Sequence, residues 1–220
     1  MPSLARRFRL LFKPLHSSKR YYSNYEFVSQ LDLASLSIYA KLKYALETLQ
    51  GSGDVLDFGC GLGYVTAFTG ARGIDVNAEA VAAAARRYPQ GRFQVASLQD
   101  IIASGERFKA VTAVNVIEHL TDEYRPEFFR TVGQVLGPKG RLIIIYDDMY
   151  HPLQLLSGLL HPGMLLTDPT HVHCWTQGRF RRMLEEHFVV ERAEGGNILS
   201  RGLPWTNRFS TACLYVCRMK

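Results

Sequence analysis

The chain has 220 residues, of which 47% are hydrophobic, and this suits a single α/β domain with a full core. No apolar run approaches the roughly 18 residues that cross a bilayer, so we expect no transmembrane segment. The formal net charge of +6 comes from residues 1–22, because the remaining 20 basic residues are matched by 20 acids. A formally neutral body argues against a nucleic-acid-binding face across the domain.

Residues 1–25 form a basic arm ahead of a single domain at 26–220. The arm contains no acid, and its basic residues are mixed with apolar ones such as Phe8, Leu11 and Phe12. A basic amphipathic helix of this kind can lie on a membrane, which makes peripheral membrane contact through residues 1–22 one interpretation. An organelle transit peptide and a helix or lid that packs on its own domain are the others, and the sequence leaves all three open.

Helical and strand patterns alternate along the rest of the chain. Strands are expected at 54–58, 72–76, 92–96, 109–115, 141–146, 188–194 and 211–218. Helices are expected at 26–49, 63–70, 77–88, 98–104, 122–136 and 176–187, with Asn77 and Thr176 as N-caps. The turn expected at 137–140 ends the helix at 122–136. Residues 147–175 are expected to form a loop that interrupts the alternation of helices and strands. This alternation predicts a doubly wound, mostly parallel sheet with helices on both faces.

The most informative segment is residues 55–63, where a buried strand runs into the turn Gly59-Cys60-Gly61-Leu62-Gly63. Glycine tolerates positive φ and lets a ligand approach the backbone, and the next helix presents unpaired N–H groups. Asp75 ends the following strand, where a carboxylate can accept hydrogen bonds from a ribose diol. The spacing G-x-G-x-G differs from the dinucleotide fingerprint, and a turn without lysine is not a phosphate-cradling loop.

The segment VLDFGCGLGYVT, with Asp75 at the next strand end, resembles the first motif of the class I S-adenosylmethionine-dependent methyltransferases. The similarity extends over roughly residues 50–190. It implies a Rossmann-like, seven-stranded sheet whose last strand is antiparallel, and it implies S-adenosyl-L-methionine as the cofactor.

The resemblance also implies a cofactor site at the carboxyl ends of the strands. Its residues are Asp57, Gly59, Cys60, Gly61, Gly63, Asp75, Val76, Ser97, Leu98 and Asn115. Ser97 stands where many family members carry an acid that accepts from the adenine amino group, so Ser97 and Leu98 are expected to recognise adenine. Asn115 begins the segment after the fourth strand, whose first residue tends to face the methionine end of the cofactor.

Methyl transfer to a hydroxyl needs a group that removes its proton, and histidines are the candidate bases. His119 follows the fourth strand, and His171 lies in a segment, Asp168-Pro169-Thr170-His171, that resembles a substrate-side segment of small-molecule methyltransferases. Both are candidate catalytic residues, and for both a structural hydrogen-bonding role is the alternative. The same region supplies carboxylates and histidines suited to a divalent cation, but their spacing is not that of a metal site, and no metal is expected.

The acceptor is indicated less directly. The Glu118-His119 pair, the Asp-Pro-Thr-His segment and the chain length resemble the ubiquinone-pathway O-methyltransferases. The apolar side chains of the loop at 147–175 suit an apolar or aromatic small molecule. They equally suit a local core or a dimer surface, so the oligomeric state stays open. We expect methyl transfer to a hydroxyl or other nucleophile of a small molecule. A non-catalytic or regulatory cofactor-binding module is the alternative, as is a protein, lipid or saccharide methyltransferase.

A nucleic-acid partner is not expected. Residues 115–118 lack the Asn/Asp-Pro-Pro-Tyr signature of enzymes that methylate base amino groups. The four cysteines include no Cys-x-x-Cys pair, which argues against a zinc site built on cysteine. Unpaired thiols fit a reducing compartment, and a cytoplasmic location is therefore expected.

Overall fold

The computed structural model describes residues 37–49, 54–148, 150–152, 172–196, 207 and 210–220. The basic arm lies outside the described residues, as do the first part of the helix expected at 26–49 and most of the loop expected at 147–175. None of the described helices is long and apolar enough to cross a membrane.

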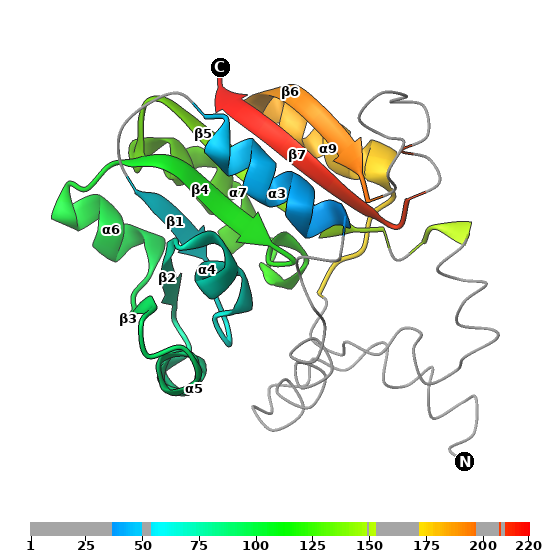
Figure 1. Ribbon diagram of the computed structural model, residues 1–220. Coiled ribbons are helices and arrows are strands. Elements are labelled where there is room, and N and C mark those ends of the chain that lie inside the picture. The colour runs from blue at the N-terminus through cyan, green and yellow to red at the C-terminus, as the bar shows by residue number, and fades with distance from the viewer. Residues whose placement is uncertain (1–36, 50–53, 149, 153–171, 197–206, 208–209) are drawn as a thin grey trace, which may run out of the picture.

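Seven strands form one sheet in the order β3-β2-β1-β4-β5-β7-β6 (Figure 1). They are β1 (Val55–Phe58), β2 (Arg72–Asp75), β3 (Arg92–Val95), β4 (Phe108–Val114), β5 (Leu136–Asp147), β6 (Phe188–Gly195) and β7 (Ala212–Met219). The first five are parallel, whereas β7 lies antiparallel between β5 and β6. The expected seven-stranded, mostly parallel sheet with an antiparallel last strand is confirmed.

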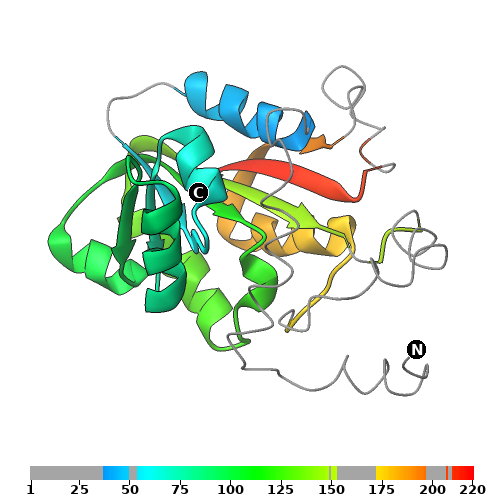
Figure 2. The same ribbon diagram turned by 60° about the horizontal axis from the view of Figure 1, so that its bottom comes forward.

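Helices cover both faces of this sheet. They are α3 (Ser37–Glu47), α4 (Tyr64–Thr69), α5 (Ala78–Arg87), α6 (Leu98–Ser104), α7 (Tyr124–Thr131) and α9 (Gln177–His187). α3 packs on β7 on one face, and α9 lies on the opposite face (Figure 2). Two short 3-10 helices, η1 (Ile117–His119) and η2 (Val132–Gln134), follow β4 and α7.

The apolar run of β5 is buried on both of its faces. Leu142, Ile144 and Tyr146 belong to a core cluster that includes α6, α7 and α9. Ile143 and Ile145 belong to a second cluster with α3. Side chains alternate along a strand, so one continuous apolar run supplies both layers of the core, as expected of a central parallel strand.

The predicted helix caps are confirmed. Asn77 Oδ1 accepts hydrogen bonds from the backbone N–H groups of Glu79 (3.0 Å) and Ala80 (3.2 Å) at the start of α5. Thr176 Oγ1 accepts from the N–H of Arg179 (3.4 Å) at the start of α9. The N–H groups in the first turn of a helix have no carbonyl partner within the helix, and each of these side chains supplies an acceptor for them.

The segment 122–140 differs from the sequence-based expectation. α7 ends at Thr131 and continues as η2, so the helix expected at 122–136 is shorter. The expected turn at 137–140 lies within β5, and a register shift opposite Phe108 and Ala110 of β4 accommodates it. Lys139 in this segment has φ 67. Turn-forming residues here make a bulge inside a strand, where the sequence suggested a boundary.

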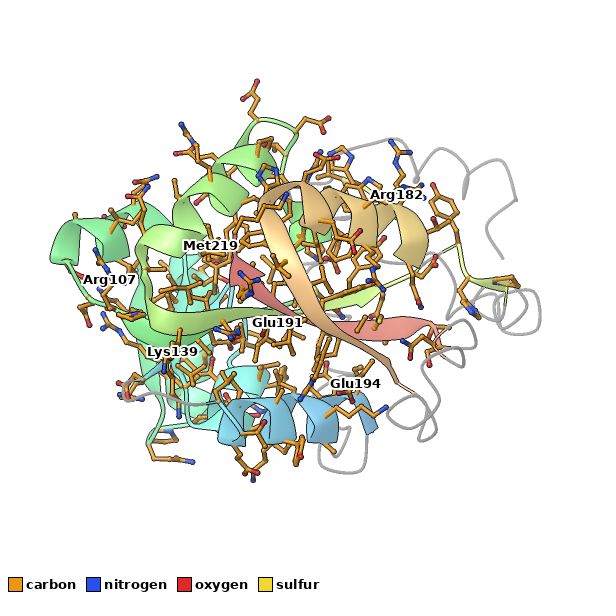
Figure 3. All side chains as sticks on the ribbon, turned by 90° about the horizontal axis from the view of Figure 1, so that it is seen from above. Arg107, Lys139, Arg182, Glu191, Glu194 and Met219 are labelled. Carbon is orange, nitrogen blue, oxygen red and sulfur yellow. The ribbon has the colours of Figure 1, made fainter. Side chains whose placement is uncertain are left out.

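The outer strand β6 is tied to its neighbours by ion pairs around Glu191, which Figure 3 labels. Arg141 Nε of β5 lies 2.6 Å from Glu191 Oε2, and Arg218 Nε of β7 lies 3.5 Å from Glu191 Oε1. Partly exposed pairs such as these contribute about 0–1 kcal/mol each. They fix the position of β6 more than they stabilise the fold.

Candidate functional site

The carboxyl ends of four strands meet at one edge of the sheet, because β1, β2, β4 and β5 run in the same direction. The chain places β2 and β3 on one side of β1, and β4 and β5 on the other, so the strand order reverses between β1 and β4. Ligands of doubly wound sheets bind outside such a switch point. Four polar residues lie at this edge: Asp57, Asp75, Asn115 and Asp147.

Asp75 holds the glycine turn in place. Its Oδ2 accepts a hydrogen bond from the N–H of Gly61 at 2.9 Å, and its Oδ1 accepts from the N–H of Asn77 at 2.8 Å. Each carboxylate oxygen can accept a further hydrogen bond. Asp75 therefore fixes the turn to the end of β2 and still has capacity for ribose hydroxyls.

The turn depends on glycine for its close approach to the segment after β4. Gly59, Gly61 and Gly63 have φ 70, 49 and 80, in the region that favours glycine. A Cβ placed on Gly59 would lie only 2.7 Å from Val116 Cγ2. Cys60 lies buried in the same turn, and burial raises the pKa of its thiol, so the thiol stays neutral.

Asp57 is buried beneath the turn, with 2% of its surface exposed. Its Oδ2 accepts the hydroxyl of Thr66 at 2.6 Å, and its Oδ1 accepts the hydroxyl of Thr112 at 2.8 Å. Burial raises the pKa of Asp57 to about 6, although both hydroxyls oppose the shift. The carboxylate thus links β1 to α4 and β4. Its expected contact with the cofactor stays a prediction.

Three residues expected to bind the cofactor, Val76, Ser97 and Leu98, differ in their exposure. Val76 follows Asp75 with 72% of its surface exposed, and it offers an apolar surface to a ring. Ser97 is the N-cap of α6, where it exchanges hydrogen bonds with Asp100. Leu98 is 1% exposed in the core, so an adenine would meet its backbone and not its side chain. The sequence did not indicate the capping role of Ser97. The contacts of Ser97 and Leu98 with adenine, and of Val76 with the cofactor, stay predictions.

Asn115 and Asp147 form the other half of the edge. Asn115 has φ 52, a conformation that few residues other than glycine adopt. Its backbone N–H donates to the carbonyl of Ile145 at 3.0 Å, and its Nδ2 donates to Asp147 Oδ2 at 2.9 Å. Burial raises the pKa of Asp147 to about 6, and the hydrogen bond from Asn115 opposes that shift.

Tyr39 of α3 is a site residue that the sequence did not single out. Burial raises the pKa of its phenol, and the charges of Asp147 and then Asp57 raise it further. Tyr39 therefore keeps its proton. Apolar spacing predicted a helix at this position, but only the packing of α3 across the sheet brings Tyr39 to the edge.

The two segments expected on the acceptor side meet at η1. The backbone carbonyl of Glu118 accepts hydrogen bonds from the N–H groups of Val172 (3.0 Å) and His173 (3.1 Å). This joins the end of the loop at 147–175 to the segment after β4. His119 is half-buried beside Glu118, whereas His171, the other candidate base, lies outside the described residues.

His173 is held by groups of α7 and the preceding loop. Its Nε2 lies 3.2 Å from Asp122 Oδ1, and its ring stacks on Trp175 with 5.3 Å between centroids. Burial lowers the pKa of His173, and the nearby Arg125 lowers it further. A neutral imidazole that is stacked in this way serves first as a structural link.

Asp148, one of the carboxylates considered for a divalent cation, takes part in a hydrogen-bond network instead. Among the described residues, no group of three His, Cys, Asp or Glu side chains is arranged to hold a metal ion. Asp148 accepts hydrogen bonds from the N–H groups of Tyr150 and Gln177, both at 2.9 Å. The structure thus gives Asp148 a role in positioning the start of α9.

The strand order, the glycine turn and the acid that ends β2 together define a class I S-adenosylmethionine-dependent methyltransferase. A family model described as a methyltransferase domain matches residues 30–187, so this chain belongs to that family. No curated protein matches the sequence.

Solved structures share the fold at low sequence identity. A TehB-like methyltransferase from Corynebacterium glutamicum is 19% identical with a TM-score of 0.58, and the match covers 92% of this chain and 98% of that one. The methyltransferase domain of bacterial CtHen1-C is 17% identical with a TM-score of 0.64, covering 86% and 99%. The small RNA methyltransferase HEN1 is 18% identical with a TM-score of 0.59, covering 82% and 25%.

S-adenosylmethionine is the cofactor of this family, and the edge fits it. Asp75 retains hydrogen-bonding capacity for the ribose, and Val76 offers exposed apolar surface. Asn115 Oδ1 is buried and has no hydrogen-bond partner among the described residues, which suits a donor on the ligand. When bound, the cofactor supplies an electrophilic methyl group on a cationic sulfur.

Proposed function

We propose that this methyltransferase transfers the methyl group to a hydroxyl, or another nucleophile, of a small molecule. The observation that carries the proposal is the junction at Glu118, where two backbone hydrogen bonds bring residues 172–173 against the segment after β4. An acceptor bound there would lie beside the switch point. The formally neutral body supports a small acceptor over a nucleic acid.

The proposed chemistry is an in-line displacement. The bond from sulfur to methyl breaks with its electron pair left on sulfur, while the acceptor oxygen forms the new bond to carbon. The acceptor proton leaves to a base, for which His119 and His171 are the proposed groups. The protein must hold the three reacting atoms in line and exclude water, and this positioning supplies much of the acceleration.

The test is an acceptor screen that measures S-adenosylhomocysteine formation from S-adenosylmethionine. Phenols, catechols and aliphatic alcohols form one set, and short RNA oligonucleotides form a second set, because the fold is shared with a small RNA methyltransferase at 18% identity. Turnover of a phenol or alcohol supports the proposal. Turnover of RNA alone contradicts it. Cofactor binding without any turnover favours the non-catalytic alternative.

Two parts of the proposal concern location. All four cysteines are free, which supports a reducing, cytoplasmic compartment. The basic arm is proposed to contact a membrane surface peripherally through residues 1–22. Co-sedimentation of the full chain with anionic vesicles, compared with a chain that begins at Tyr25, tests this contact. Equal binding of the two chains contradicts it.

A further inference from the structure

The end of β5 carries the carboxylate of Asp147, which takes no part in the proposed methyl transfer. Asp147 is the last residue of β5, and β5 is the neighbour of β4 on the side away from β1. Adjacent strands lie about 4.8 Å apart, so the end of β5 is about 5 Å beyond the end of β4. A ligand that reaches from Asp75 across the switch point toward Asn115 brings its far end close to Asp147.

Asn115 and Asp147 form one corner of the strand-end edge, and the hydrogen bond between them shows how the Asn115 amide is oriented. An ionised carboxylate only accepts hydrogen bonds, so the NH₂ group of Asn115 must face Asp147, and its Oδ1 must face away. That Oδ1 is buried without a partner among the described residues. The corner therefore presents a carboxylate and an unused carbonyl oxygen, and both attract hydrogen-bond donors or positive charge.

The surroundings do not neutralise Asp147. The groups that interact with Asp147 are the phenol of Tyr39 in α3, which feels its charge, and the side-chain amide of Asn115 at the end of β4, which donates a hydrogen bond to it. On β7 the residue paired with Asp147 is Ala212. Within the part of the chain that the structure describes, no lysine, arginine or histidine forms an ion pair with Asp147. Asp147 is half-buried, and a carboxylate that is partly removed from water without a cation costs stability unless a ligand brings one.

We propose that Asp147 makes the site prefer a ligand with a positive charge at its methyl-bearing centre over the neutral product. The donor is a sulfonium cation, and methyl transfer converts it to a neutral thioether. The charge that Asp147 attracts is thus present before transfer and absent afterwards. Asp147 is a specificity-determining residue that favours loading of the donor and release of S-adenosylhomocysteine.

This role concerns affinity more than rate. In the transition state the positive charge of the sulfonium is partly dispersed, so a nearby carboxylate stabilises the bound donor at least as much as the transition state. Asp147 should therefore change the ratio of donor to product affinities and leave the chemical step little altered. The inference rests on the cofactor and not on the proposed acceptor.

The test uses two ligands that differ at the position of the sulfur. S-adenosylhomocysteine is neutral there, and sinefungin carries an ammonium group in place of the methylsulfonium. Their affinities for the full chain are measured by calorimetry at pH 8.0 and pH 5.0. In the wild type we expect the preference for sinefungin over S-adenosylhomocysteine to fall about tenfold at the lower pH, where Asp147 is protonated.

The variant Asp147→Asn should show the low preference at both pH values. Asp57 also titrates near this range, so any pH dependence that persists in the variant is assigned to Asp57. Asp122→Asn is the matched control, because Asp122 is an exposed carboxylate whose partners are Arg125 and His173. The control should keep the wild-type ratio.

Three results would overturn the inference. One is a wild-type ratio that does not change between pH 8.0 and 5.0, which needs no variant. The second is an Asp147→Asn protein that binds both ligands with the wild-type ratio at pH 8.0. The third is binding of neither ligand by the wild type, which would overturn the cofactor assignment as well. If Asp147→Asn does not fold, Asp147→Ser replaces it under the same criteria.

Discussion

The two halves of the strand-end edge differ in how their polar groups are satisfied. On the β1 and β2 side, Asp57 accepts two hydroxyls and Asp75 accepts two backbone N–H groups. On the β4 and β5 side, Asp147 has the single hydrogen bond from Asn115, whose own oxygen has no partner among the described residues. The first half is organised before any ligand binds. Among the described residues, the second half keeps acceptor atoms that are available to a ligand.

This difference suggests a division of labour. We propose that the β1 and β2 half, which we name the nucleoside half, binds the nucleoside. The nucleoside is the same in every catalytic cycle, so a preorganised half binds it at low entropic cost. The methyl-bearing end changes charge during each cycle, and we propose that the acceptor enters on the β4 and β5 side, which we name the acceptor half. A half with unsatisfied groups can respond to those changes, but it costs stability in the absence of ligand.

The largest expected effect is the loss of turnover when His119, on the β4 and β5 side, is replaced. If His119 is the base, His119→Ala should lower turnover about 10²- to 10⁴-fold once an acceptor is known. Affinity for S-adenosylhomocysteine should stay unchanged, because the nucleoside half is untouched. Single-turnover rates and calorimetry on one preparation separate the two effects. Loss of cofactor binding in parallel with rate would mean that His119 is structural.

The next prediction concerns a substitution in the glycine turn, on the preorganised β1 and β2 side. Gly59→Ala should lower stability by about 2–3 kcal/mol and weaken cofactor binding, because the new Cβ combines an unfavourable φ with contact at 2.7 Å to Val116. Gly105→Ala is the matched control, since its φ is 73 but no atom lies within 4 Å of the added Cβ. Urea denaturation should show a smaller loss for the control. Equal losses would refute the role of close approach.

Removal of the ribose acid should have a smaller effect that is confined to binding. Asp75→Ala should weaken S-adenosylhomocysteine binding by about 2 kcal/mol, which is the size of hydrogen bonds to a charged group. The glycine turn also loses the acceptor of the Gly61 N–H. Calorimetric titration measures the change, and circular dichroism checks the fold. Unchanged affinity would contradict the ribose assignment.

The smallest predicted effect is a gain in stability when Asp147, on the β4 and β5 side, is replaced by Asn. The pKa of Asp147 is raised to about 6 from 3.8, so its protonated form favours folding at low pH, and this contribution is lost as pH rises through 6. At pH 8 Asp147→Asn should therefore be more stable than the wild type by about 1–2 kcal/mol, because Asn keeps the neutral charge state.

Thermal denaturation at pH 8.0 and pH 4.0 checks this prediction. The advantage of the Asn variant should shrink at pH 4.0, where Asp147 of the wild type is protonated in the folded state. Asp57 is present in both proteins, so its own titration cancels in the difference. A difference that is independent of pH would show that the charge of Asp147 is not what destabilises the fold.

The positions of the glycine turn, Asp75 and Asn115 at the strand-end edge were predictable from the sequence, whereas the hydrogen bond between Asn115 and Asp147 was not. The glycine turn, Asp75 and the caps at Asn77 and Thr176 act through neighbours that are close in sequence or at the end of the next strand. The charge of Asp147 acts on Tyr39 across about a hundred residues of chain, and no local pattern records this. Ser97 is the N-cap of α6, which the sequence did not indicate, and its contact with adenine stays a prediction.

The position of β7 has a consequence for how the chain folds. β6 reaches the rest of the sheet only through β7, although β6 is synthesised first. Until β7 is inserted, the apolar edge of β5 is open and can pair with other chains. Closing the sheet is therefore a late, non-local step, and we expect this step to limit the folding rate. During that interval, the edge of β5 is an aggregation-prone surface of the folding chain.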